Sequence, residues 1–251
     1  MNQKEGERIF EACREGNVHE VQQLVNANNI NAQDKSEWQR TPLFIACEFG
    51  HIEIVRLLLN QQSIDVNKIN TDEKAPLFIA CRNGFVEIVK LLLNDARTNV
   101  NYGITIRNTG TPSSGFGSSR AITETPLHIA CELGHIEIVK LLLNNEKVGV
   151  NQGNRSQQSA LTIACQFGHT EIVKLLLKNE RVDMEKDVNQ KAFHTASNYG
   201  KIEVLEIFLN EARMKMRKDE EERQRIEEQI RLEERRKQGP KSIFQIFSFI
   251  I

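Results

Sequence analysis

Apolar and polar positions repeat along this 251-residue chain at a spacing of 34 residues. The segment Arg40–Asn60 (RTPLFIACEFGHIEIVRLLLN) recurs in register at 74–94, 124–144 and 158–178, and weaker copies occupy 6–26 and 190–210. One glycine marks each copy, and successive glycines lie 34, 34, 50, 34 and 32 residues apart: Gly16, Gly50, Gly84, Gly134, Gly168 and Gly200. A fixed period of this length is typical of proteins built from stacked supersecondary units.

Each copy predicts a helix, a turn and a second helix, as the fourth copy illustrates. Thr125 is suited to cap the first helix, Pro126 fits its first position, and Gly134 fits the left-handed conformation that ends it. The second helix is expected from about Ile136 to Asn144, with apolar side chains around most of its circumference. Such a helix has to be covered on more than one side, so the copies are expected to stack.

The five cysteines occupy one position of the repeat, each directly after an alanine: Cys13, Cys47, Cys81, Cys131 and Cys165. Packed helices of adjacent copies would hold these positions ~8–10 Å apart, beyond the ~7 Å Cα separation that a disulfide allows. The sequence has no CxxC pair of the kind that zinc sites use. We therefore expect buried free thiols and a reducing compartment, the cytoplasm.

The repeated motif resembles that of a known family. In the fourth copy T-P-L-H-I-A-C-x-x-G-H-x-E-I-V-K-L-L-L, followed by Gly149-Val150-Asn151, closely resembles the ankyrin repeat, and the resemblance covers about residues 6–210. It implies an all-α solenoid of about six antiparallel helix pairs joined by β-hairpin loops. The copies would lie near 6–39, 40–73, 74–102, 124–157, 158–189 and 190–210.

Three segments depart from the repeat. The 50-residue spacing places a flexible, Gly- and Ser-rich insertion at 103–123, interpreted either as a partner-contacting finger or, preferably, as a tolerated loop. Residues 211–238 are almost all charged and predict one long helix, because no Gly or Pro occurs between Lys201 and Gly239. A solvated single helix is favoured over a coiled coil, since the apolar positions are too few for a heptad seam. An apolar tail, 239–251, follows.

Catalytic chemistry is not indicated. The sequence has no phosphate loop, no HExxH and no GxSxG motif, so we expect neither an enzyme nor a cofactor. His51, His135 and His169 recur with the repeat and are expected to be structural, not metal ligands. The 33 basic and 34 acidic residues give a net charge of −1, which provides no field for nucleic acid.

A protein-binding surface is predicted from variable positions inside the constant frame. The resemblance implies that the residues after each Ala-Cys face a concave groove, and Trp38 and Arg40 lie in the loop before the second copy. The predicted partner-binding residues are Trp38, Arg40, Glu48, Phe49, Arg82, Asn83, Glu132, Leu133, Gln166, Phe167, Asn198 and Tyr199. Phe49 and Phe167 have the alternative of packing between neighbouring repeats.

The expected function is that of a monomeric, non-catalytic scaffold that binds a protein partner through its concave face and hairpin tips. The alternative is a membrane-tethered or self-associating module that uses the charged helix and the apolar tail. No apolar run approaches the roughly 18–20 residues that span a bilayer, and the N-terminus has no apolar segment of a secretory signal. Membrane contact through the tail is therefore the less favoured reading.

Overall fold

A computed structural model describes residues 3–36, 38–105, 122–154, 156–184 and 187–237. The described chain is helical apart from one pair of short strands. The elements in chain order are α1 Gln3–Glu15, α2 Val18–Leu24, α3 Pro42–Phe49, α4 Ile52–Leu59, α5 Pro76–Arg82, α6 Val86–Asn94, β1 Ile104–Thr105, β2 Ile122–Glu124, α7 Pro126–Glu132, α8 Ile136–Asn144, α9 Ala160–Phe167, α10 Thr170–Lys178, α11 Asp187–Asn198 and α12 Ile202–Lys237.

The first helix of a pair begins at the predicted cap. The Thr125 hydroxyl accepts the His128 N–H, and the Thr125 N–H donates to His128 Nδ1, which completes a capping box. His128 Nε2 then donates to the Gln152 carbonyl at 3.0 Å. Burial lowers the pKa of His128 to about 4, so the ring is neutral at physiological pH. Pro126 occupies the first turn, as predicted.

The first helix ends at a glycine in the left-handed conformation. Gly50 has φ 82°, and Gly134 has φ 75°. A Cβ at Gly50 would lie 2.8 Å from the Phe85 ring of the next pair, so glycine also permits the close approach of neighbours. The second helix of the fourth copy, α8, spans the predicted residues Ile136–Asn144.

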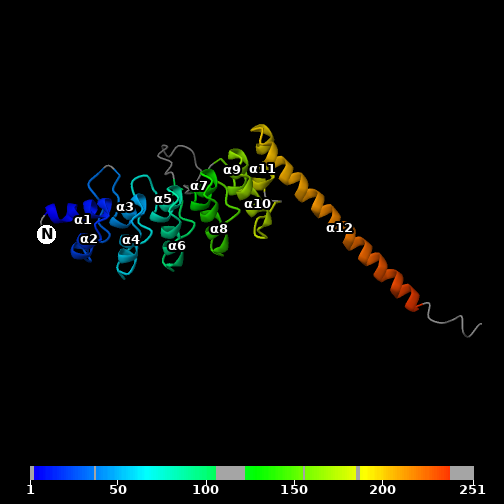
Figure 1. Ribbon diagram of the computed structural model, residues 1–251, viewed down its shortest axis with the longest axis horizontal. Coiled ribbons are helices and arrows are strands. Elements are labelled where there is room, and N and C mark those ends of the chain that lie inside the picture. Colours follow the sequence, from blue (N-terminus) through cyan, green and yellow to red (C-terminus); the bar gives the residue numbers. More distant parts are fainter. Residues whose placement is uncertain (1–2, 37, 106–121, 155, 185–186, 238–251) are drawn as a thin grey trace, which may run out of the picture. The chain divides into compact units, whose positions relative to one another are not determined.

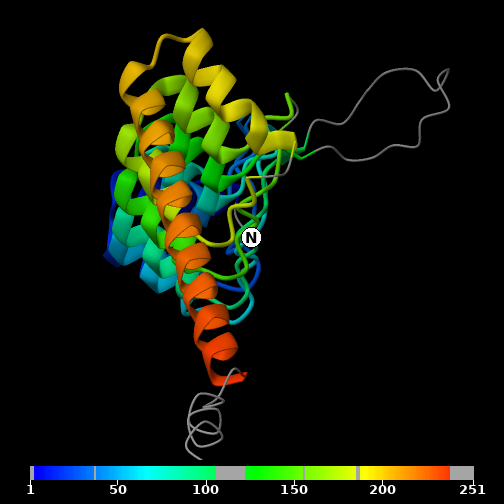
Figure 2. The same cartoon turned by 90° about the vertical axis from the view of Figure 1, so that its right-hand side faces the viewer.

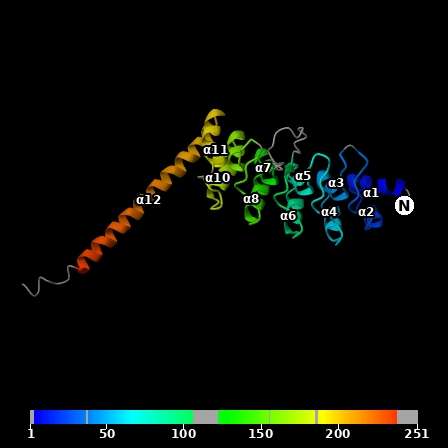
Figure 3. The ribbon, with the colours of Figure 1, turned by 180° about the vertical axis from the view of Figure 1, so that it is seen from behind.

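The helix pairs stack in a row with two layers (Figures 1 and 3). One layer contains the successive contacts α1 to α3, α3 to α5, α5 to α7, α7 to α9 and α9 to α11. The other contains α2 to α4, α4 to α6, α6 to α8 and α8 to α10. Among the described helices, each pair therefore makes its main contacts with its neighbours, which is the arrangement of a repeat solenoid.

The core lies between the layers and between successive pairs. Every residue of α3 from Pro42 to Cys47 is buried, and α8 buries Ile138, Val139, Leu142 and Leu143. All five cysteines are buried free thiols, which confirms the prediction. Burial raises the pKa of Cys13 and Cys165 to about 12, so these thiols stay protonated and unreactive.

The loops between pairs are closed by an Asx side chain instead of a strand ladder. The Asp34 N–H donates to the Arg40 carbonyl, and the Arg40 N–H donates back to Asp34 Oδ1, both at 2.9 Å. The pairs Asn70–Lys74 and Asn154–Gln158 repeat this exchange. Figure 2 looks along the row and shows these loops on one side of the helices.

Regular strand pairing in the described part of the chain is confined to β1 and β2, where Ile104 pairs with Glu124 and Thr105 with Ile122. β-Hairpins at every loop are therefore not confirmed. β1 and β2 lie at the beginning and the end of the insertion. Most of that predicted insertion, at 106–121, lies outside the described residues, as does the predicted apolar tail from 239 onward.

The chain divides into two compact units, Met1–Val204 and Leu205–Ile251. The second unit contains most of α12, which runs to Lys237 as the absence of Gly and Pro predicts. Its side chains from Leu209 to Arg235 are all exposed. Among the described residues, no helix combines the length and the apolar character that crossing a membrane requires.

Candidate interaction surface

Variable residues occupy three equivalent positions in or next to the first helix of each copy from the second to the fifth. Each position forms one row. The loop row precedes each helix cap and contains Arg40, Lys74, Glu124 and Gln158. The helix row follows the buried Ala-Cys pair and contains Glu48, Arg82, Glu132 and Gln166. The end row is one residue further and contains Phe49, Asn83, Leu133 and Phe167. Because α3, α5, α7 and α9 contact in succession, each row runs along the array.

Within the second copy, the charge of the loop-row residue Arg40 is paired with that of the helix-row residue Glu48. Arg40 Nη1 lies 3.0 Å from Glu48 Oε2, and the same guanidinium lies 3.1 Å from Asp34 Oδ2. Burial raises the pKa of Asp34, but hydrogen bonds from Ser36 and Arg40 outweigh it, so the net pKa is lowered and the carboxylate stays charged. The Arg40 side chain is only 15% exposed, and it therefore holds its loop in place more than it offers a free charge.

The third and fourth copies carry like charges that do not cancel within a copy. The third has Lys74 and Arg82, and the fourth has Glu124 and Glu132. Burial, followed by the charge and hydrogen bond of Glu132, raises the pKa of Glu124 to about 7, although Arg82 and Lys74 lower it. These four side chains thus act on one another, and a basic copy meets an acidic copy at this point.

A hollow of about 180 Å³ opens between the loops that precede the second and third copies. Its lining includes Trp38, Glu48, Asp72, Lys74 and Arg82. Lys74 Nζ pairs with Asp72 Oδ2 at 3.1 Å. Trp38 is 44% exposed, so a flat aromatic surface stands beside these charges.

The apolar residues predicted for the partner surface are exposed. Phe49, Leu133 and Phe167 are each 44% exposed, and Tyr199, at the end of α11, is 57% exposed. Phe49 and Phe167 stack on the histidines of their own copies, with ring centroids 6.5 Å from His51 and 6.3 Å from His169. Asn198 is exposed beside Tyr199, whereas Gln166 is half-buried and accepts a 2.7 Å hydrogen bond from Gln158.

The recurring histidines connect neighbouring copies. Nε2 of His51, His135 and His169 donates to the carbonyl oxygens of Arg14, Arg82 and Glu132, at 2.9, 3.1 and 2.9 Å. Each acceptor directly follows the Ala-Cys pair of the preceding copy. The prediction that these histidines are structural is in accord with this geometry.

The third copy has Phe85 in place of this histidine. The equivalent acceptor, the Glu48 carbonyl, takes its hydrogen bond from Asn83 Nδ2 at 2.8 Å instead. Asn83, predicted as a partner-binding residue, is therefore exposed but already has a role inside the array.

Asparagine side chains form hydrogen bonds between the loops of neighbouring copies, and this series is called the asparagine ladder. Asn67 Nδ2 donates to the Arg97 carbonyl, and Asn67 Oδ1 accepts the Asn99 N–H. Asn31, Asn101 and Asn151 make the same pair of bonds to the copy that follows each. The sequence places Glu185 where the next asparagine would fall, so the described ladder ends at the fifth copy.

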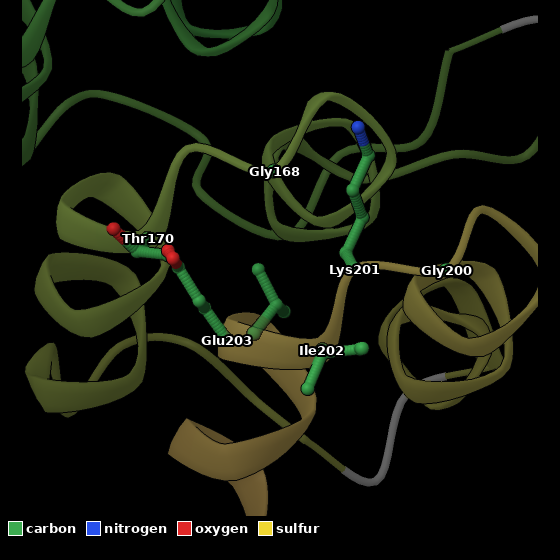
Figure 4. Close-up of a pocket in the computed structure, with 7 residues that line it drawn as sticks. Gly168, Thr170, Gly200, Lys201, Ile202 and Glu203 are labelled. Carbon is green, nitrogen blue, oxygen red and sulfur yellow. The ribbon is translucent and has the colours of Figure 1, made fainter.

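Two further hollows lie at the turns between the first and second helices of neighbouring copies. One of about 270 Å³ is lined by Gly168, Lys201 and Ile202 (Figure 4). Another of about 360 Å³ lies at Gly84 and His135, the corresponding place between the third and fourth copies. Because the same hollow recurs, it is a product of the repeat geometry and carries no specific chemistry.

Sequence reasoning missed part of the surface. It selected Arg40 from the loop row but not Lys74, Glu124 or Gln158, although these vary in register with Arg40 and could have been found by the same criterion. In the described part of the chain, no group of three or more His, Cys, Asp or Glu is placed to hold a metal ion. The surface offers charge and apolar area, which suit recognition of a macromolecule.

Stacked helix pairs joined by side-chain hydrogen bonds define a helical repeat protein. Residues 9–102 and 113–187 match the family model described as ankyrin repeats (3 copies). The chain belongs to the ankyrin repeat family. Comparison with curated proteins gave no match.

Proposed function

We propose that this protein is a non-catalytic scaffold that binds a protein partner through the three rows and the loop tips. The observation that carries the proposal is the exposure of Trp38, Leu133 and Tyr199, at 44–57%. Tryptophan and tyrosine are preferred anchors of protein interfaces. Ankyrin repeats generally mediate protein–protein interaction, which supports the same function.

The test is affinity purification followed by mass spectrometry, with full-length wild type and the variant Trp38→Ala/Leu133→Ala/Tyr199→Ala as baits. We expect a partner that wild type retains and the triple variant loses. The matched control is Ile52→Ala, which truncates a 37% exposed apolar residue on α4, in the other layer. Equal recovery with the triple variant would place the binding surface elsewhere.

We further propose the domain organisation read from the sequence. Six copies would occupy 6–210, the last near 190–210, with 103–123 as an insertion, 211–238 as a charged spacer helix and 239–251 as a tail. The proposed state is a monomer in the cytoplasm. Sedimentation equilibrium of the full chain tests the monomer.

The second candidate is a self-associating or membrane-tethered module. It is supported by exposed apolar residues on α12, among them Ile226, Ile230 and Leu232, which are 47–51% exposed. Deleting 242–251 and, separately, replacing Ile226 and Ile230 with Gln distinguishes the two forms. A loss of vesicle pelleting with the deletion would indicate tethering, and a smaller oligomer with the Gln variant would indicate self-association.

A further inference from the structure

The most specific chemistry of the surface lies where the third and fourth copies meet. Arg82 and Glu132 occupy the same position of the repeat in α5 and α7, which are in contact. They present opposite charges side by side along the array. The other neighbouring pairs of the helix row are less distinctive, because Glu48 is neutralised by Arg40 and Gln166 is uncharged.

Arg82 is the most exposed of the three cations that line the Trp38 hollow. The other two cations of its lining are already paired: Arg40 with Glu48 and Asp34, and Lys74 with Asp72. Arg82 is exposed and forms no salt bridge among the described residues, although its charge acts on Glu124 and lowers the pKa of that carboxyl. A carboxylate that entered the hollow would find the guanidinium of Arg82 and the Trp38 ring together.

Glu132 supplies the negative charge that is complementary to Arg82. Its carboxyl lies beside that of Glu124, and both are half-buried. Two carboxyls held together repel each other when both are ionised. Arg82 and Lys74 already reduce this repulsion in part. A further basic side chain placed against Glu132 reduces it more, so the fourth copy favours a cation in the position where the third copy favours an anion.

The spacing of the repeat restricts the backbone that can satisfy both. Packed neighbouring helices lie ~8–10 Å apart. A polyproline II segment has three residues per turn and rises about 3.1 Å per residue, so its residues i and i+3 share a face about 9 Å apart. A β-strand would point residues i and i+3 to opposite faces. Aromatic-lined grooves are also a usual site for polyproline II segments, and Trp38 supplies the aromatic ring.

We propose that this surface binds an extended, polyproline II segment of a partner protein that carries an acidic and a basic side chain three residues apart, with the acid against Arg82 in the Trp38 hollow and the base against Glu132. The inference rests on the proposed scaffold function and names the chemistry of the partner. The segment can run in either direction along the array.

The test uses synthetic proline-rich peptides on an array, probed with the full-length protein. The peptides carry acid/base, acid/acid or base/base pairs at spacings of two, three, four and seven residues. We expect the acid/base pair at spacing three to bind about fivefold tighter than either like-charged pair, the scale of a partly exposed ion pair. Preference for spacing seven would indicate a helical ligand and overturn the proposal, and so would no dependence on spacing.

Charge-reversal variants test the assignment of each residue. Arg82→Glu should shift the preference at spacing three to base/base peptides, and Glu132→Arg should shift it to acid/acid peptides. Gln166→Ala, in the same row, is the control and should keep the wild-type preference. Thermal melts by circular dichroism confirm that each variant is folded, and unchanged preferences in folded variants would overturn the assignment.

The outcomes separate this inference from the proposed function. If Trp38→Ala/Leu133→Ala/Tyr199→Ala loses the cellular partner while the peptides show no charge preference, the scaffold function stands and the inference fails. If the triple variant retains the partner, the proposed surface itself fails.

Discussion

Asn83 donates a 2.8 Å hydrogen bond from Nδ2 to the carbonyl oxygen of Glu48, in the helix of the preceding copy. In other copies a histidine ring supplies this bond, and here its place is taken by Phe85. The Phe85 ring still packs over Gly50, as the His51 ring packs over Gly16. The packing and hydrogen-bonding roles of the histidine are thus divided between two residues.

This division predicts a rescue. Asn83→Ala should lower the free energy of unfolding by about 1 kcal/mol, because the Glu48 carbonyl loses its donor. Phe85→His in the Asn83→Ala background should recover most of that loss, because an imidazole at this position reaches the same carbonyl in three other copies. Urea denaturation of the four proteins of this double-mutant cycle measures the coupling. Additive effects, with no recovery in the double variant, would contradict the shared role.

The asparagine ladder predicts a larger effect from a surface residue. Asn67→Ala removes two bonds to the next copy, at 2.8 and 2.7 Å, and should cost about 1–2 kcal/mol of unfolding free energy. Asn94→Ala, at an exposed position at the end of α6, is the matched control and should change stability by less than about 0.5 kcal/mol. The measurement is the urea midpoint, and equal shifts would show that the ladder contributes little.

Core and surface positions should separate in a melting experiment. Leu142, in α8, is fully buried, and Leu142→Ala should cost about 2–5 kcal/mol through the cavity it leaves. Trp38→Ala/Tyr199→Ala should leave the melting curve nearly unchanged, because both side chains are largely exposed. If the surface pair lowers the melting temperature as Leu142→Ala does, these side chains belong to the core, and the interaction surface is wrongly placed.

Glu124 predicts a pH dependence of stability. Its pKa is raised from 4.5 to about 7 in the folded protein, so the folded chain keeps a proton that the unfolded chain loses between these values. Stability is therefore lost as pH rises from about 4.5 to about 7, and it stays lower above that range. Glu124→Gln should stabilise the protein by about 1 kcal/mol at pH 8, after allowance for solvent screening, and by nothing near pH 4.5.

Urea denaturation at the two pH values measures this difference. The control is Glu137→Gln, which changes an exposed glutamate on α8 that pairs with Lys140; its effect on the free energy of unfolding should stay within about 1 kcal/mol at both pH values. A Glu124→Gln effect of equal size at both pH values would show that the folded pKa is not raised.

The sequence predicted the features that depend on local signals. Thr125, Pro126 and Gly134 mark the ends of a helix by their own conformational preferences, and the structure confirms them. The buried cysteines followed from their register alone. Long-range features were not predicted in this way. The Asn83–Glu48 bond joins residues 35 apart and needs the actual stacking geometry.

The loops show why some site predictions needed the structure. Residue type predicts Arg40 as a partner-binding anchor, and only the structure shows that the turn brings Asp34 and Glu48 to its guanidinium. The predicted β-hairpins depended on backbone pairing, whereas Asp34 and its equivalents close the loops with a side chain. In both cases the competing interaction lies four to eight residues away.

The bonds from Asn101 to Lys147 and Gly149 span 46 and 48 residues of chain, at 2.7 and 2.8 Å. Together with the β1–β2 pairing, these bonds join the chain before the insertion to the chain after it. Continuity of the solenoid thus depends on contacts in space and not on an unbroken period in the chain. A protein engineer could therefore graft a foreign epitope or a reporter domain between β1 and β2, and the neighbouring copies should keep their alignment.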